Sequence, residues 1–270
     1  MHGEENGQKA DPNGGASPTR PLTQPLTWIT GASSGIGRAL AIHLANAGER
    51  VALSARNTED LAATAQLSAE RMRIFPLDVT DRKATAAAVA AIERWLGPID
   101  RAVLNAGTHT PMSLEDFSAD TARRLMEVNY MGVVHGLEAL LPRMRARGRG
   151  HVAVVASVAG YRGLPTAAAY GPTKAALINL CESLKPDCDR AGIRLQLVCP
   201  GFVDTPLTAR NGFPMPNLMQ VEDAARELAD GLEGGGFEIA FPKRFTRKLK
   251  LARLLPYRAY FPLVRKVTGA

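Results

Sequence analysis

Tyr170 and Lys174 lie four positions apart in a stretch with helical spacing. On a helix, side chains at this separation lie on one face. A phenol titrates near ~10, too high for easy proton exchange at neutral pH, and a neighbouring ammonium group favours the phenolate and lowers that pKa. The pair predicts a general acid and base that gives a proton to a carbonyl oxygen in a reduction or takes one from an alcohol in an oxidation.

Ser157 ends the apolar run 151–156 and precedes Tyr170 by thirteen residues. In open α/β sheets, ligands bind at the carboxyl ends of the strands. At that place the Ser157 hydroxyl can donate a hydrogen bond to the substrate oxygen and stabilise the negative charge that develops there. We therefore predict that Ser157 acts with Tyr170 and Lys174.

A glycine-rich loop follows the first apolar run, residues 26–30, and leads into a helix. Gly31 permits a tight turn, Gly35 lets the backbone approach a pyrophosphate, and Gly37 lets the helix pack close to the strand. The helix N-terminus then faces the negative charge. Strand, loop and helix in this order predict a dinucleotide cradle formed by Gly31, Ser33, Ser34, Gly35, Ile36 and Gly37.

The end of the second apolar run indicates which dinucleotide binds. An acidic residue there would bind the adenosine ribose hydroxyls and repel a 2′-phosphate. This chain has Ala55 and then Arg56, and the planar guanidinium can donate two hydrogen bonds to a phosphate. Ser33 and Ser34 add hydroxyl donors. The sequence therefore predicts NADP(H) rather than NAD(H).

The elements that must position these residues alternate along the chain. Helical patterns at 36–47, 57–69, 81–95, 122–146, 168–185 and 222–232 separate seven short apolar runs. These runs are Leu26–Thr30, Arg50–Ser54, Arg73–Leu77, Asp100–Leu104, His151–Ala156, Arg194–Val198 and Phe237–Phe241. The alternation predicts an α/β, doubly wound Rossmann fold, with a mostly seven-stranded parallel sheet covered by helices on both faces.

The loop spacing Thr-Gly-x-x-x-Gly-x-Gly resembles the short-chain dehydrogenase/reductase family in its shorter, single-domain branch. The resemblance covers about residues 26–240. It extends through Asp78-Val79 after the third run, Asn105-Ala106-Gly107 after the fourth, Asn129 in Val128-Asn129-Tyr130-Met131-Gly132, Ser157, Tyr170-Gly171-Pro172-Thr173-Lys174, and Pro200-Gly201 with Thr205 shortly after.

The resemblance implies further roles. Lys174 also binds the nicotinamide ribose, Asn129 holds a water that passes protons to Lys174, and Thr205 meets the nicotinamide carboxamide. Asp78 lies near the adenine. The remaining positions expected at the cofactor are Val79, Asn105, Ala106, Gly107, Tyr170, Pro200, Gly201 and Val203.

Composition divides the chain into three parts. Hydrophobic residues make up 46% and charged residues 22%, typical of a globular protein with a full core. Residues 1–24 are polar and rich in Gly, Pro and Asn, which predicts a disordered tail without a secretory signal. Residues 25–242 form the catalytic and cofactor-binding domain, and residues 243–270 form a basic amphipathic tail.

The tail carries nine lysines and arginines and no acid, so the rest of the chain has a net charge of −2 although the whole has +7. Interleaved basic, apolar and aromatic residues favour peripheral contact with an anionic membrane. Packing on its own domain or on a second subunit is equally compatible with this pattern. We expect no nucleic acid partner, because no recognition module is present.

Several other features bear on the surroundings of the site. Residues 205–221 contain Phe213, Met215, Leu218 and Met219, a composition that suits an apolar lid. Pro186 lacks an N–H and is expected to end or kink the helix that carries Tyr170, which leaves a homodimer or a homotetramer open. The histidines are expected to be structural, with His109 the one that could face the substrate. We expect no metal site, and three cysteines without metal spacing indicate reduced thiols in the cytoplasm.

Taken together, these features predict an NADP(H)-dependent oxidoreductase that moves a hydride to or from a carbonyl or secondary alcohol of a lipophilic small molecule. A non-catalytic NADP-binding regulator or scaffold at a membrane surface is the alternative. A sugar-nucleotide epimerase is a weaker rival, since such relatives usually have a different glycine spacing and a longer C-terminal domain.

Overall fold

The computed structural model describes residues 24–212 and 215–268. The predicted disorder of residues 1–24 therefore lies outside the described residues, apart from Gln24. The described chain confirms the predicted seven-stranded parallel sheet, with strand order β3-β2-β1-β4-β5-β6-β7. Its strands are β1 Leu26–Thr30, β2 Arg50–Ser54, β3 Met72–Ile74, β4 Arg101–Leu104, β5 Gly150–Val155, β6 Ile193–Pro200 and β7 Glu238–Phe241.

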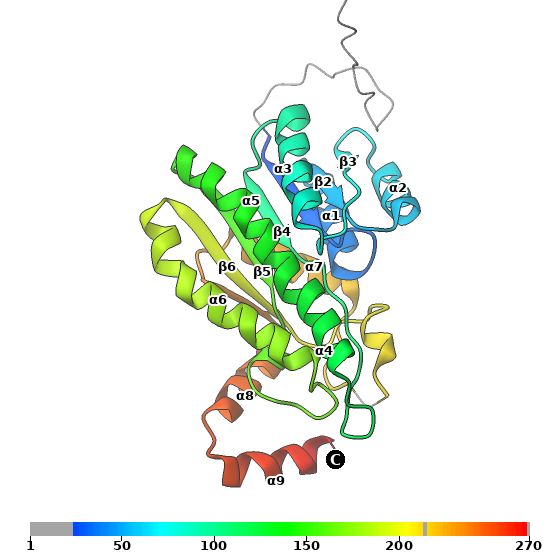
Figure 1. Ribbon diagram of the computed structural model, residues 1–270, viewed down its shortest axis with the longest axis vertical. Coiled ribbons are helices and arrows are strands. Elements are labelled where there is room, and N and C mark those ends of the chain that lie inside the picture. Colours follow the sequence, from blue (N-terminus) through cyan, green and yellow to red (C-terminus); the bar gives the residue numbers. More distant parts are fainter. Residues whose placement is uncertain (1–23, 213–214, 269–270) are drawn as a thin grey trace, which may run out of the picture.

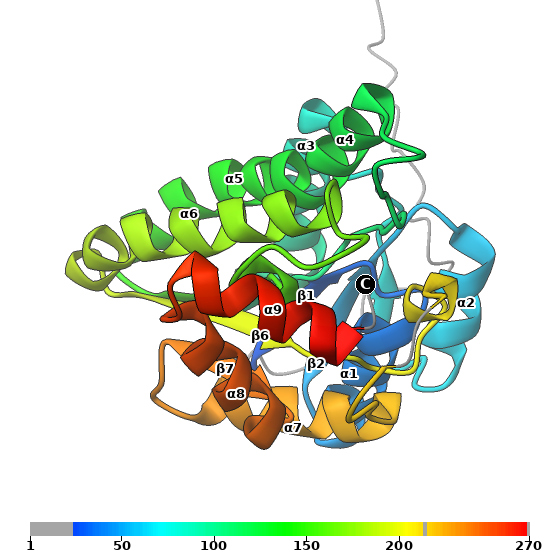
Figure 2. The same ribbon diagram turned by 90° about the horizontal axis from the view of Figure 1, so that it is seen from below.

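Helices cover both faces of the sheet (Figures 1 and 2). One layer holds α1, α2 and α7, and the other holds α3, α5 and α6. The bounds are α1 Gly35–Asn46, α2 Thr58–Gln66, α3 Arg82–Leu96, α4 Ala119–Met126, α5 Gly132–Arg147, α6 Tyr170–Arg190, α7 Val221–Glu233, α8 Lys243–Arg253 and α9 Tyr257–Thr268.

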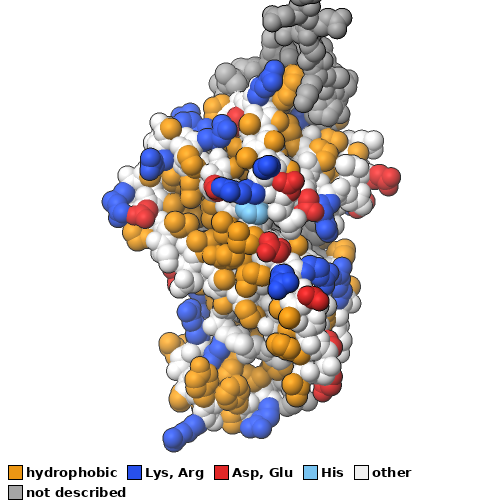
Figure 3. Space-filling model, viewed as in Figure 1, with side chains coloured by type: hydrophobic (Ala, Val, Ile, Leu, Met, Phe, Trp, Pro, Cys, Tyr) orange, Lys and Arg blue, Asp and Glu red, His pale blue; other side chains and the backbone are white. Residues whose placement is uncertain are grey.

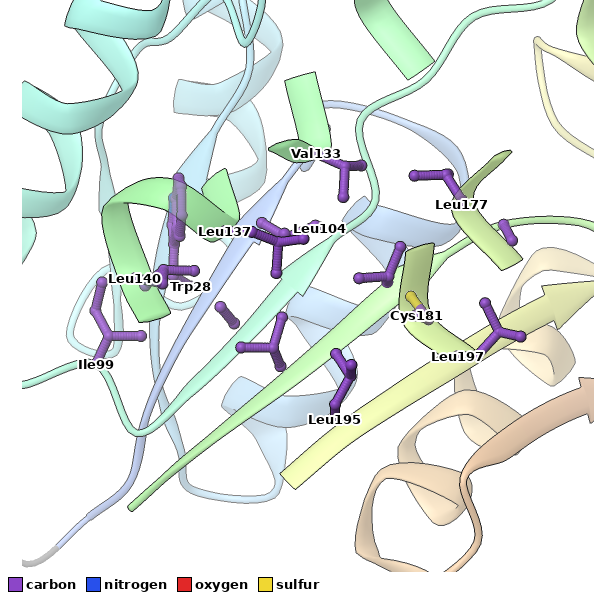
Figure 4. Packing of buried hydrophobic residues seen from close by; sticks show 14 of the residues in the cluster. Trp28, Ile99, Leu104, Val133, Leu137, Leu140, Leu177, Cys181, Leu195 and Leu197 are labelled. Carbon is purple, nitrogen blue, oxygen red and sulfur yellow. The ribbon is translucent and has the colours of Figure 1, made fainter. Parts of the chain in front are cut away.

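Each face of the sheet has its own core. Figure 4 shows one of them, where Leu104 lies beside Leu137 of α5; Trp28 and Leu177 of α6 belong to the same cluster and lie on either side of this pair. All five residues of β1 are buried, because a central parallel strand is covered on both faces and loses the alternation of a half-exposed strand. Burying each large apolar side chain contributes about 1.5–3 kcal/mol, so the central strands hold their carboxyl ends in fixed positions.

The helix predicted at 122–146 is divided in the structure. A π-helical turn, Glu127–Met131, separates α4 from α5, and it contains the buried Asn129. Such turns widen a helix by one residue and occur often at functional sites. Amphipathic spacing alone does not distinguish this turn from a continuous α-helix.

Of the two outcomes expected at Pro186, an end or a kink of the helix, the end is not found, and the kink stays a prediction. Helix α6 includes Pro186 and continues to Arg190. The proline is exposed, so its ring meets solvent, and water can solvate the carbonyl that lost its N–H donor. Strand β3 is shorter than the predicted Arg73–Leu77, because Pro76 cannot donate a hydrogen bond to the ladder. The backbone N–H groups of Phe75 and Leu77 still donate to the carbonyl oxygens of Leu53 in β2 and of Ala55 just after it.

Gly37 provides a test of the close packing between α1 and the end of β1. A methyl group at this position would lie 2.3 Å from the Gly31 carbonyl oxygen, and backbone cannot move away cheaply. We expect Gly37→Ala to lower the free energy of unfolding by about 1–3 kcal/mol, measured by urea denaturation. Gly235→Ala is the matched control, since nothing lies within 4 Å of its added methyl group. Equal stability of the two variants would contradict this packing.

Candidate active site

A pocket of about 670 Å³ lies at the carboxyl ends of the strands. It extends from the glycine-rich loop to the last turn of α9. Of the residues predicted for the site, the lining includes Gly31, Ser33, Ser34, Gly35, Ile36, Arg56, Asp78, Val79, Asn105, Ala106, Gly107, Ser157, Tyr170, Lys174, Pro200, Gly201, Val203 and Thr205. Gly37 and Asn129 lie behind this lining. The parallel sheet thus brings residues from the ends of six strands, β1 to β6, to one cavity.

The glycine-rich loop has the conformation that its glycines predict. Gly31 and Gly35 have positive φ angles of 69° and 52°, which favour glycine. A Cβ on Gly31 would lie 2.9 Å from the Cα of Ala106, so the loop packs directly on the turn after β4. Ser34 is the N-cap of α1, but its side chain makes no capping hydrogen bond, which leaves the first N–H groups of the helix to face an anion.

Hydrogen bonds tie the ends of β1 and β4 together. The Thr30 hydroxyl accepts from the N–H groups of Asn105 (3.0 Å) and Ala106 (3.1 Å). In return, the Asn105 side-chain amide donates to the carbonyl oxygens of Thr30 (3.1 Å) and Gly31 (3.3 Å). These bonds fix the Asn105-Ala106-Gly107 turn against the glycine-rich loop.

Arg56 follows β2 at the adenosine end of the pocket. Its side chain is exposed, and Ala55 occupies the position where a carboxylate would favour NAD(H). Asp78 lies close enough for the Arg56 charge to act on it. Partial burial would raise the pKa of Asp78, but hydrogen bonds from Thr80 and the charge of Arg56 outweigh this and lower the pKa.

Tyr170 and Lys174 begin α6 on the opposite wall. Lys174 is 3% exposed, and its ammonium group donates to the Val155 carbonyl oxygen at 2.9 Å and lies 5.6 Å from the centre of the Tyr170 ring. Ser157 lies beside them, close enough to the Tyr170 phenol for its hydroxyl to lower the pKa of that group. The structure therefore brings the three predicted residues together on the pocket wall.

The predicted fall in the pKa of Tyr170 is not found. Burial raises it to about 12, and the Ser157 hydroxyl offsets only part of this rise. Burial also lowers the pKa of Lys174 to about 8. Among the groups that the chain itself supplies, desolvation outweighs the mutual attraction of phenolate and ammonium.

Asn129 positions the turn beside the lysine rather than lining the pocket. Its side-chain oxygen accepts from the Thr108 N–H (2.7 Å), and its amide donates to the Thr108 carbonyl oxygen (2.9 Å) and the Thr173 hydroxyl (3.1 Å). A methyl group on Gly107 would lie 3.3 Å from the Asn129 oxygen and 3.6 Å from the Lys174 nitrogen. The water relay expected of Asn129 stays a prediction.

His109 belongs to the pocket lining, as the sequence left open. Its ring meets the Tyr170 ring edge to face, with centroids 4.8 Å apart, and its Nε2 bonds the Asn211 side-chain oxygen at 3.0 Å. The Nδ1 atom is buried and has no partner within the described part of the chain. Burial lowers the pKa of His109, which favours neutral imidazole next to the Tyr170 phenol. The one sequence signal for it was its place two residues after the Asn-Ala-Gly turn.

The segment predicted as a lid has two halves. Thr205, Leu207 and Asn211 line the pocket, whereas Met219 pairs with Val203 and packs against the sheet. Leu218 is exposed, and Phe213 lies outside the described residues. Opening and closing of this segment stays a prediction.

The basic tail also contributes to the pocket, which the sequence did not predict. Phe245 and Leu249 of α8, with Val267 and Thr268 of α9, form part of the lining. Residues 243–268 are anchored through Arg162, which donates to the carbonyl oxygens of Ala252 (2.9 Å) and Leu255 (2.6 Å). Its own domain is therefore one partner of the tail. The signal available in the sequence was only the apolar spacing of the tail.

Comparison with known proteins agrees with this arrangement. The family model described as short chain dehydrogenase matches residues 26–213. A Myxococcus xanthus protein described as an uncharacterized oxidoreductase is 38% identical over 231 residues, which are 84% of this chain and 91% of that protein. The chain belongs to the short-chain dehydrogenase family.

Two solved short-chain dehydrogenases illustrate the range of cofactors. One from Burkholderia cenocepacia, in complex with NADP, has a TM-score of 0.79 at 25% identity and covers 91% of this chain and 99% of that one. One from Burkholderia phymatum, in complex with NAD, has a TM-score of 0.78 at 26% identity and covers 86% and 93%. The positive-φ glycines and the α1 N-terminus of this short-chain dehydrogenase fit such a dinucleotide.

The buried ammonium of Lys174 generates a stability prediction for this short-chain dehydrogenase. Its folded pKa of about 8 lies below the unfolded value of 10.5. Charge burial therefore costs stability below pH 8, on the order of 3 kcal/mol, and this cost falls as the pH rises from 8 to 10.5. We expect Lys174→Met to be more stable than the parent at pH 7 and to lose that advantage toward pH 10.5, measured by urea denaturation at each pH. Lys83→Met, at an exposed position, is the control; a pH-independent difference for Lys174→Met would contradict the assignment.

Proposed function

We propose that this oxidoreductase transfers a hydride between NADP(H) and a carbonyl or secondary alcohol, with Tyr170 as general acid and base. The observation that supports the proposal most is the meeting of Ser157, Tyr170 and Lys174 on one buried wall of the pocket that begins at the glycine-rich loop. A non-catalytic binding protein has no need of a buried ammonium beside a half-buried phenol, because the loss of hydration costs free energy for both groups.

In the reduction, the nicotinamide cofactor held in this cradle would supply the hydride. Ser157 orients the substrate oxygen and donates a hydrogen bond to the charge that grows there. Tyr170 gives its proton to the same oxygen. The raised pKa of Tyr170 keeps the phenol protonated at neutral pH but makes it a weaker acid. Its proton transfer would therefore depend on the Lys174 ammonium, which would stabilise the phenolate that remains.

The lining near the catalytic wall favours a lipophilic substrate. Leu164 and Leu207 face the same cavity as Phe245 and Leu249. Apolar walls with a few convergent polar groups are typical of sites for small apolar ligands.

We propose a cytoplasmic enzyme, since Cys181, Cys188 and Cys199 are free and buried. The homo-oligomeric state stays a prediction.

Tyr170→Phe tests the chemistry. The substitution removes the proton donor and keeps the ring, so we expect kcat to fall by about 10²–10⁴. NADPH oxidation would be measured with ketosteroids, long-chain ketones, 3-ketosphingoid bases and small aldehydes. Tyr130→Phe is the control, because Tyr130 packs on the core away from the pocket. Turnover that survives Tyr170→Phe would overturn the mechanism, and no NADPH oxidation with any carbonyl would favour a binding role.

Arg56→Asp tests the cofactor. Loss of the guanidinium removes charge-assisted hydrogen bonds worth about 1.5–3 kcal/mol, so KM for NADPH is expected to rise by roughly 10- to 100-fold while KM for NADH falls. Both constants come from initial rates with one ketone substrate. Arg149→Asp, at another exposed position, should change neither. Unaltered constants in Arg56→Asp would show that Arg56 is only a solvated surface charge.

A further inference from the structure

Residues 243–268 fold into α8 and α9, which cross the pocket end of the molecule (Figure 2). One side of this helix pair holds it to the domain. Phe245 and Leu249 pack against the core, the Tyr260 hydroxyl donates to the Gly163 carbonyl oxygen at 2.5 Å, and the Arg162 guanidinium lies 3.8 Å from the centre of the Tyr260 ring. These contacts anchor the helix pair to the domain.

Around these anchoring contacts, the helix pair leaves large apolar groups in water. Six of them are 40% to 80% exposed: Leu251, Leu254, Tyr257, Phe261, Leu263 and Val267. We call these six residues the apolar tail surface. Figure 3 shows hydrophobic side chains gathered where α9 lies in Figure 1, with lysines and arginines at their edge. Contiguous exposed apolar groups of this kind mark contact with another surface.

The charges of the tail indicate which kind of partner surface the apolar tail surface contacts. Two of its nine cations have carboxylate partners, since Lys250 pairs with Glu238 and Lys243 lies 3.9 Å from Glu227. Within residues 24–212 and 215–268, no ion pair is formed by the other seven: Arg244, Arg247, Lys248, Arg253, Arg258, Arg265 and Lys266. The surface therefore combines exposed apolar groups with unneutralised positive charge.

An anionic lipid surface complements both properties. Apolar and aromatic side chains enter the acyl boundary while lysine and arginine meet the headgroups. A second copy of the chain fits less well, because a twofold interface would bring the same cations face to face. No helix among the described residues is long and apolar enough to cross a membrane, so the contact would be made along the surface.

The same helices form part of the pocket wall. Val267 belongs to the apolar tail surface and also lines the pocket, as do Phe245, Leu249 and Thr268 on the inner side of the pair. A molecule that leaves a lipid layer beside α9 would enter the pocket past these side chains. Its route would expose little apolar surface to water.

We propose that residues 243–268 dock on an anionic lipid surface and that the pocket takes an amphiphilic, lipid-dissolved ketone or alcohol from it. The first part of this proposal, docking on lipid, rests only on the exposed apolar residues and the charges of residues 243–268. The substrate half rests on the proposed function, because it names the class of carbonyl that Tyr170 would protonate.

Vesicle sedimentation with the full-length chain tests the docking. The lipids are phosphatidylcholine alone and phosphatidylcholine with about 30% phosphatidylglycerol. We expect binding to the anionic vesicles at least about tenfold tighter than to the neutral ones, with much of it lost when the salt is raised to about 0.5 M. Equal binding to both lipids, or none to either, would overturn the proposal.

Two variants separate the contributions. Arg258→Gln/Arg265→Gln/Lys266→Gln removes charge, and Leu251→Ser/Leu254→Ser/Phe261→Ser removes apolar contact; each should weaken anionic binding by about tenfold or more. Matched controls at exposed positions outside the tail are Lys83→Gln/Arg145→Gln/Arg149→Gln and Leu114→Ser/Phe117→Ser, which should bind as the parent does. Controls that weaken binding as much as the tail variants would contradict a specific docking surface. So would an apolar variant that changes oligomeric state by gel filtration and not lipid binding.

Activity completes the design. With a long-chain ketone held in anionic vesicles, the two tail variants should lose at least about tenfold in rate, while their rates with a short soluble ketone stay at the parental value. Full rates with the vesicle-held ketone would overturn the substrate half. Absence of turnover with every carbonyl would contradict the proposed function. The sedimentation experiment would still test lipid docking, because it does not depend on activity.

Discussion

The contact between the ends of β1 and β4 is the constraint on which the site depends. Thr30 accepts two backbone N–H groups from the Asn105-Ala106 pair, and the Asn105 amide returns two hydrogen bonds to the β1 side. Gly37 packs on the Gly31 carbonyl from the other direction. The cradle for the dinucleotide and the turn that ends in Gly107 are therefore parts of one rigid junction.

This junction positions the pocket wall that carries Ser157, Tyr170 and Lys174. Gly107 leaves room for the Asn129 oxygen and the Lys174 nitrogen, and Asn129 reaches its position through the π-helical turn between α4 and α5. Lys174 is then held by the Val155 carbonyl at the end of β5. Two neighbouring strand ends and one widened helix turn thus fix the distance between the Tyr170–Lys174 pair and the glycine-rich loop.

The electrostatics of this wall favour chemistry over stability. Burial raises the pKa of Tyr170 to about 12 and lowers that of Lys174 to about 8, so each group is disfavoured in its charged form. Sites arranged for catalysis often keep ionisable groups in such unfavourable surroundings. The apolar cores on both faces of the sheet supply the stability that this arrangement costs.

Local patterns in the sequence determined the fold class, the order of the strands along the chain, the glycine-rich loop and the Tyr170–Lys174 pair. They did so because strand and helix periods, glycine conformations and the four-residue helix spacing are properties of neighbouring residues. The family motifs also placed Asn129 and Ser157 at the site. The expected membrane contact of the tail remained open, because amphipathic spacing does not state which partner an apolar face meets.

Only the tertiary structure decided the rest. It brought His109 against Tyr170, and it placed the tail helices in the pocket lining, where Phe245 contacts Phe202; in each case the two residues are more than forty positions apart along the chain. It kept α6 helical through Pro186, since solvent can replace the missing hydrogen bond at an exposed position. Among the groups that the chain itself supplies, burial also raises the pKa of Tyr170, where the spacing of the Tyr170–Lys174 pair predicts a fall. Burial depends on the packing of distant elements, and no local pattern reports how much water a side chain loses.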